Sequence, residues 1–66
     1  MTFATLERHA LSDGGAAALE RQGRTYAVVR SYPEPLTAPD LAMGLSLRDA
    51  RAALADVLRA DVLESD

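Results

Sequence analysis

Residues 33–46, PEPLTAPDLAMGLS, contain two helix-start signals with one helix stop between them. Thr37 is a favoured N-cap residue for a short helix, and Asp40 follows it at the spacing of a capping box. Gly44 is a favoured residue for ending that helix, and Ser46 for capping the next one. The stretch therefore predicts two helices that meet at a tight corner. Such a corner either presents a helix to DNA or only joins two structural helices.

The clearest helix of the sequence follows this corner, roughly from Leu47 to Leu63. Its apolar residues recur at helical spacing and form one stripe, while Leu36 and Leu41 occupy the staple positions of the shorter helix before it. We expect the stripe to pack on Val28, Val29 and Leu41 of the same chain. The alternative is that it lies in the groove of a protein partner or of a second copy. For that alternative, the candidate partner-binding residues are Leu47, Leu54, Leu58 and Val62.

The first half of the chain is less certain in its secondary structure. Residues 24–32, RTYAVVRSY, are the strongest strand candidate because β-branched and aromatic residues favour strands. Alanine-rich residues 16–23 favour a helical turn, and the alternative is a hairpin that pairs residues 17–21 with the strand. A third alternative makes TYAVVRSY helical. Residues 3–11 fit either a short helix or a strand, and residues 12–15, SDGG, form a break.

We therefore predict a single small domain over residues 1–66, of the α+β class and dominated by helices. It would have a short strand or hairpin near 24–32, a capped helix-turn-helix at 37–63 and an acidic, frayed C-terminal tail at 64–66. The alternative is an all-α fold. A chain of 66 residues buries only about 60% of its unfolded surface. Because its apolar residues are largely alanine, we expect a protein partner or a homodimer to add stability.

Composition argues against several classes of chemistry. The chain has no cysteine and one histidine, His9, so thiolate and multi-histidine metal sites are excluded. His9 is expected to be a structural residue, and nothing in the sequence places the carboxylates of Glu7 and Glu20 together. Gly14 and Gly15 lack the spacing of a phosphate-binding loop. We expect no catalytic residues, no cofactor and no metal.

Charge and hydropathy bear on partners and location. The formal net charge is −3, whereas a strongly basic chain would favour nucleic acid. No stretch approaches 18 apolar residues and no basic, then apolar, leader begins the chain. We therefore expect a cytoplasmic protein with no membrane partner. The absence of lysine beside seven arginines is typical of a GC-rich genome, and we expect a bacterial or phage source.

Two resemblances to known families add to these expectations. Within residues 35–63, the stretches LT at 36–37, DLA at 40–42 and GLS at 44–46 resemble the helix-turn-helix portion of small winged-helix regulators. That resemblance implies that the second helix enters the major groove of DNA. The DNA contacts it implies are Ser46, Arg48 and Arg51.

The second resemblance is carried by RQGRTYAVVR at residues 21–30, which is similar to a strand of prevent-host-death-type antitoxins. We expect a non-enzymatic regulatory or adaptor protein that acts through protein–protein contact, as a small transcriptional regulator or an antitoxin-like protein. The alternative is a pure protein-binding inhibitor or accessory subunit, for example of phage type, with no DNA contact. Nucleic acid is thus the second class of partner, after protein.

Overall fold

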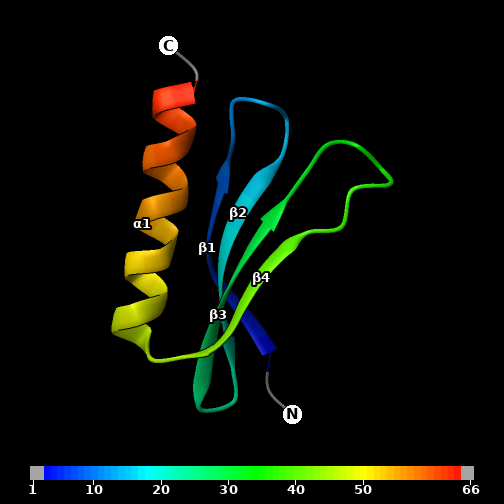
Figure 1. Cartoon of the computed structure of the whole chain (residues 1–66). Helices are drawn as coiled ribbons and strands as arrows, with labels where there is room; N and C mark the ends of the chain where they lie inside the picture. Colours follow the sequence, from blue (N-terminus) through cyan, green and yellow to red (C-terminus); the bar gives the residue numbers. More distant parts are fainter. Residues whose placement is uncertain (1–2, 65–66) are drawn as a thin grey trace.

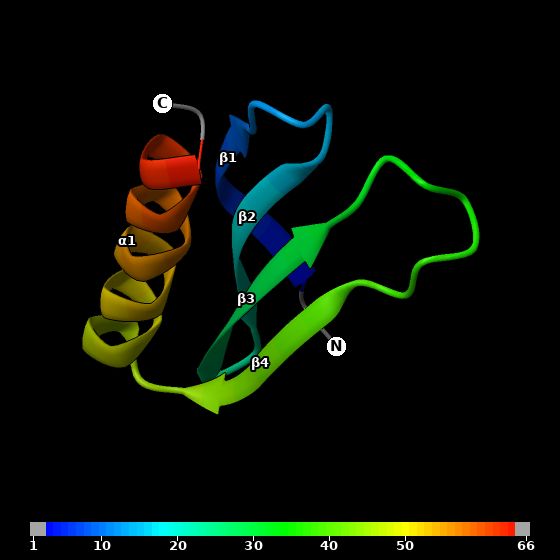
Figure 2. The same ribbon diagram turned by 45° about the horizontal axis from the view of Figure 1, so that its top comes forward.

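In the described part of the chain, four antiparallel strands form one sheet, and a single helix packs against one of its faces (Figures 1 and 2). The computed structural model describes residues 3–64. The strands lie side by side in chain order, as a meander, and the helix follows the last strand. The elements are β1 (Phe3–Ala10), β2 (Ala16–Gln22), β3 (Thr25–Ser31), β4 (Asp40–Leu45) and α1 (Leu47–Glu64).

The fold is therefore dominated by strands, so the predicted helix-dominated α+β domain and its all-α alternative are both wrong. The strand expected near residues 24–32 is confirmed as β3. The helical turn expected at residues 16–23 is replaced by the hairpin alternative, in which β2 pairs with β3 along its whole length. Alanine prefers a helix by only tenths of a kcal/mol per residue. Pairing with a strand on each side outweighs that preference in β2.

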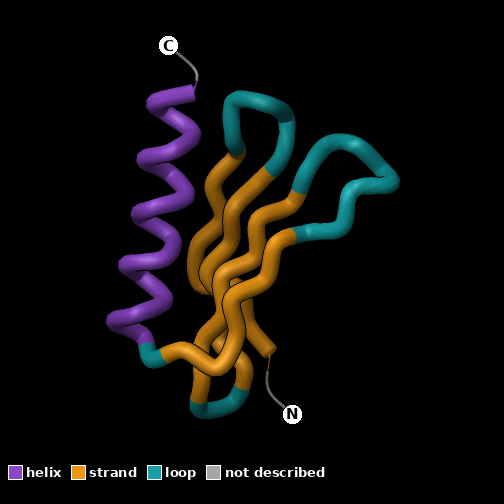
Figure 3. Tube along the Cα trace, in the orientation of Figure 1, coloured by secondary structure: helices purple, strands orange, loops and turns teal. Residues whose placement is uncertain are grey.

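The first helix of the predicted helix-turn-helix at 37–63 does not form, which is a further correction. Residues 32–39 are instead a loop between β3 and β4, and it projects well beyond the strands (Figures 2 and 3). The backbone N–H of Thr37 donates to the carbonyl of Glu34 at 3.1 Å, in a turn rather than a helix cap. Proline biases the residue before it towards extended conformations, and this region holds Pro33, Pro35 and Pro39.

The expected staple and helix stop are also absent. Leu36 is 99% exposed in the loop, and Leu41 lies in β4. Gly44 has a φ of 70°, in the left-handed region that favours glycine. It lies where the register between β3 and β4 shifts, so it belongs to a β-bulge and does not end a helix.

The long helix is confirmed, with α1 running from Leu47 to Glu64. Ser46 caps it as predicted, because its side-chain Oγ accepts the backbone N–H of Asp49 at 3.1 Å. Glu64 is the last residue of α1, and residues 65–66 of the predicted tail lie outside the described residues. In the described part of the chain, no helix combines the length and apolarity needed to cross a membrane.

The hydrophobic core lies between α1 and the sheet. Leu19 in β2 and Val28 in β3 are cross-strand partners, and Ala50 and Leu54 of α1 pack against them. Side chains alternate between the two faces of a strand, so Val29 points away from this core. The expected same-chain packing of the helix stripe is therefore confirmed for Val28 but not for Val29 or Leu41. The buried cluster consists of Leu11, Ala17, Leu19, Val28, Ala50 and Leu54.

Candidate functional site

The sheet face that α1 does not cover carries the exposed apolar side chains Leu41 and Met43 of β4; we call it the open face. Because Leu19 and Val28 point towards α1, their neighbours Ala18 and Val29 point the other way. The open face crosses three strands through the pairs Ala18↔Val29 and Val29↔Leu41. Its apolar centre consists of Ala18, Ala27, Val29, Leu41 and Met43.

Exposure rises across the open face towards β4. Ala27 is fully buried between its neighbours and Val29 is half-buried, whereas Leu41 and Met43 are each 58% exposed. Isolated exposed apolar residues are ordinary on protein surfaces, but a contiguous group marks an interaction surface. Leu41 and Met43 are contiguous with Val29 through the β3–β4 pairing. They make the open face a candidate site for contact with another surface.

Charged side chains on the open face are few and balanced. Arg8 pairs with Ala18 in the register between β1 and β2, and Glu20 pairs with Thr5 and with Ala27. Both therefore lie on the open face, beside its apolar centre. One arginine and one glutamate give this face no net charge, so it is not a surface that attracts polyanions.

Both edge strands of the sheet are irregular. The register between β1 and β2 shifts between Thr5 and Glu7, and the register between β3 and β4 shifts between Tyr26 and Val28. Bulges twist an edge strand and interrupt its row of hydrogen-bonding groups, which hinders the addition of another strand. The open face, and not the sheet edges, is therefore the better candidate for association.

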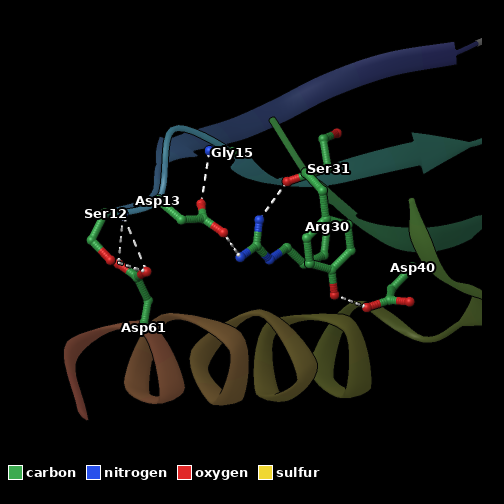
Figure 4. A network of polar contacts seen from close by, with 8 residues as sticks. Ser12, Asp13, Gly15, Arg30, Ser31, Asp40 and Asp61 are labelled. Atoms are coloured by element: carbon green, nitrogen blue, oxygen red, sulfur yellow. Dashed lines mark hydrogen bonds and ion pairs between the residues drawn. The ribbon is translucent and has the colours of Figure 1, made fainter. Parts of the chain in front are cut away.

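A network of polar contacts ties the loops at one end of the sheet to the end of α1 (Figure 4). The carboxylate of Asp61 in α1 accepts the backbone N–H of Ser12 at 3.1 and 3.2 Å, and the Ser12 hydroxyl at 2.7 Å. Ser12 lies in the loop between β1 and β2. These bonds therefore fasten that loop to the last turns of the helix.

Arg30 in β3 holds the second part of this network. Its Nη2 donates to the Asp13 carboxylate at 2.7 Å, its Nη1 donates to the Ser31 carbonyl, and its guanidinium lies 4.2 Å from the centre of the Tyr32 ring. The hydrogen bond from Arg30, and then one from the backbone of Gly15, lower the pKa of Asp13. Arg30 therefore joins the β1–β2 loop to the start of the β3–β4 loop.

Tyr32 extends the network to β4. Its hydroxyl donates to the carboxylate of Asp40, and that hydrogen bond raises the pKa of the phenol. Between this network and α1 lies a cavity of about 310 Å³, whose lining includes Arg30, Asp61 and Glu64. The Nη2 and Nη1 groups of Arg30 already donate to Asp13 and to the Ser31 carbonyl. Among residues 3–64, no group of three or more histidine, aspartate or glutamate side chains is arranged to hold a metal ion. The network is thus built as a structural clamp.

The predicted DNA contacts lie at the start of α1. Ser46 caps the helix through Asp49, and Arg48 and Arg51 are both exposed. The helix that was to precede them is absent, so the helix-turn-helix scaffold that would present them to DNA does not exist in this fold. Arg48 and Arg51 remain an exposed pair separated by one helical turn.

The predicted partner-binding stripe is divided by the fold. Leu54 is buried in the core, and Leu47 and Leu58 pack against it while half-buried. Val62 is 62% exposed near the end of α1. Three of the four residues thus serve the core of their own chain, and the surface that sequence reasoning missed is the open face.

The remaining sequence candidates are separated by the sheet. The Nε2 atom of His9 lies 3.3 Å from the Oε1 atom of Glu7, and both residues are in β1. Glu7 pairs with Leu19, on the face towards α1, whereas Glu20 lies on the open face. The two glutamates therefore do not converge on one site. A strand assignment for residues 16–22 would have revealed both this separation and the open face.

Comparison with known proteins gives no relative from which a role could be transferred. No family model, no curated protein and no solved structure matches the chain.

Proposed function

We propose that this chain is a non-enzymatic regulatory or adaptor protein that acts through protein–protein contact on the open face. The observation that carries the proposal is the uncovered side of the sheet, where exposed Leu41 and Met43 continue the apolar row from Val29. Full burial of a Leu, Val or Met side chain contributes about 1.5–3 kcal/mol. Leu41, Met43 and Val29 are already partly buried in the chain, so covering them contributes part of this amount from each residue.

The shape and charge of the open face favour a protein as its ligand. A small molecule needs a concave pocket that covers most of its surface, whereas the open face is one side of a sheet. Nucleic acid needs clustered basic side chains, and here Arg8 is balanced by Glu20. The balanced charge favours a protein-binding inhibitor or accessory subunit without DNA contact over a transcriptional regulator.

Site-specific photo-crosslinking in living cells tests the proposal. A photoreactive amino acid replaces Leu41 on the open face or, as a matched control, Ala52, which is exposed on α1. We expect position 41 to give a protein adduct of one defined mass and position 52 to give none. The adduct should disappear when Val29→Glu is added, because a charge then stands in the apolar centre. Absence of an adduct at position 41, or the same adducts from both positions, would refute the proposed function.

A further inference from the structure

We propose that the partner on the open face is a second copy of this chain, which forms a twofold-symmetric, face-to-face dimer with its strands running in opposite directions. This inference rests on the proposed function, since it names the protein that covers the open face. Two sheets that pack face to face lie about 10 Å apart and bury their facing side chains. The product is a β-sandwich with one helix on each outer side.

The open face is complementary to itself in this arrangement. Its centre is two neighbouring rows that run across the strands. One row contains Ala18, Val29 and Leu41, and the other contains Ala27 and Met43. Consider a twofold axis that lies in the interface, perpendicular to the strands and midway between the two rows. This axis places each row of one copy over the other row of the second copy. Leu41 then packs on Met43 of the second copy, and Val29 lies over the row of the second copy that contains the smaller, already buried Ala27.

Charges beside the apolar centre fit the same axis. Arg8 extends the first row onto β1, and Glu20 lies in the second row on β2. With the rows exchanged, Arg8 of one copy approaches Glu20 of the other, and the pair occurs twice because of the symmetry. A dimer whose strands run in the same direction would lack this pairing.

The two ends of the sheet also differ in charge. The end of the sheet at the β2–β3 turn carries Arg21 and Arg24, whereas the other end carries Asp13 and Glu34 in its loops and Asp40 at the start of β4, with Arg30 bonded to Asp13. Figure 1 shows these loops and this turn at opposite ends of the strands. Because the strands of the two copies run in opposite directions, the basic end of each lies towards the acidic end of the other. Such complementarity favours this orientation.

The exposed area is in keeping with an uncovered interface. The accessible surface is 4686 Å², whereas a monomer of 7.0 kDa is expected to expose about 4,000 Å². The projecting β3–β4 loop, whose residues 33–39 are all exposed, contributes to this excess, and a standard interface buries roughly 800 Å² on each partner. An interface at the small end of this range is expected to dissociate at micromolar concentrations.

The mass of the purified chain in solution is the first test. Sedimentation velocity over about 1–500 µM, at low salt where charge pairs are least screened, should show the mass rise from 7.0 kDa towards twice that value. Val29→Glu should leave a monomer at every concentration, whereas the matched control Ala52→Glu should dimerise like the parent. Far-UV circular dichroism of both variants shows that they are folded. A parent that stays monomeric, or dimerisation that survives Val29→Glu in the folded variant, would overturn the proposal.

A charge exchange tests the register without touching the apolar centre. Arg8→Glu and Glu20→Arg each put two like charges opposite one another, and each should weaken the dimer at least about threefold. The double variant restores opposite charges and should return to within about twofold of the parent. Failure of the double variant to recover would exclude the proposed axis.

Chemical crosslinking gives a second readout of the same axis. The chain has no cysteine, so an introduced thiol is the only one present. A short bis-maleimide should join Leu41→Cys chains to Met43→Cys chains when the two are mixed, while Ala52→Cys gives no dimer. Equal crosslinking of all three variants would contradict the face-to-face arrangement.

These results separate the two proposals. If the purified chain is monomeric but position 41 crosslinks in cells to a different protein, the second copy is excluded and the proposed function stands. If position 41 gives no adduct in cells and the purified chain is monomeric, both proposals fail.

Discussion

Leu19→Ala tests the architecture most directly, because Leu19 is the largest side chain that the sheet and helix enclose completely, with no exposed surface. The substitution removes three carbon atoms, which are worth about 0.8 kcal/mol each in transfer free energy. A residual cavity adds to this, so we expect the free energy of unfolding to fall by about 3–4 kcal/mol. A chain of 66 residues has a total stability of about 3–10 kcal/mol. The variant should therefore lose about a third or more of the total stability.

The assay is urea unfolding followed by circular dichroism, with parent and variant at one fixed protein concentration. A small domain changes its stability by about 1 kcal/mol per molar urea, so the midpoint should fall by about 3 M. The matched control is Leu36→Ala, because Leu36 is almost fully exposed in the β3–β4 loop. Leu36→Ala should change the free energy of unfolding by no more than about 0.5 kcal/mol. If Leu19→Ala lowers the free energy of unfolding by less than about 1 kcal/mol, or if Leu36→Ala lowers it by the same amount as Leu19→Ala, the packing described for this sheet is refuted.

Three further predictions concern the loops and the helix cap. A Cβ at Gly15 would overlap a neighbouring backbone carbonyl, so Gly15→Ala should lower the free energy of unfolding by about 1–3 kcal/mol in thermal melts; an unchanged melting temperature would contradict the close approach. Ser46→Ala should lower the free energy of unfolding in urea by about 1 kcal/mol, whereas Ser46→Asp should retain most of the parent's stability, because aspartate is also a good N-cap. Equal stability of the two variants would exclude the cap. The folded state raises the pKa of Tyr32 above its ordinary value of 10.0 through the hydrogen bond to Asp40, so the stabilisation is complete below pH 10 and is lost at higher pH. Absorbance titration in a Tyr26→Phe background should show a phenol midpoint above 10 that Asp40→Asn lowers, and an unmoved midpoint would exclude that bond.

The long helix α1 and the strand at 24–32 could be predicted because signals within their own residues specify them. Ser46 and the apolar stripe of α1 specify that helix through its cap and its 3.6-residue period. Tyr26, Val28 and Val29 specify β3 because β-branched and aromatic side chains suit a pleated surface. Both elements were predictable because their own residues favour them without help from neighbours.

The strands β2 and β4 depend on their neighbours instead. Alanine in β2 favours a helix slightly, and only pairing with β1 and β3 overrides it. In residues 37–44, the cap-like Thr37 favours a helix, whereas the prolines around it bias the residues that precede them towards an extended chain. Gly44 is compatible with either a helix end or a β-bulge. The six residues of β4 are too few for their hydrophobic period to distinguish a helix from a strand.

The polar network could not be predicted from the sequence at all. Ser12 and Asp61 are 49 residues apart and meet only because the helix folds back along the sheet. Arg30 and Asp13 are likewise brought together by the β2–β3 register, and no local pattern specifies that contact.

The order of the elements has a consequence for the chain as it is synthesised. The meander ends at Leu45, so all four strands are synthesised before the first residue of α1. Until Ala50 and Leu54 dock, the nascent sheet has Leu19 and Val28 exposed on one face in addition to Leu41 on the other. Synthesis proceeds at about 5–20 residues per second, so residues 46–64 follow the meander within about 1–4 seconds. Docking of α1 is therefore the last step of folding in chain order, and it covers the apolar face that Leu19 and Val28 would otherwise expose.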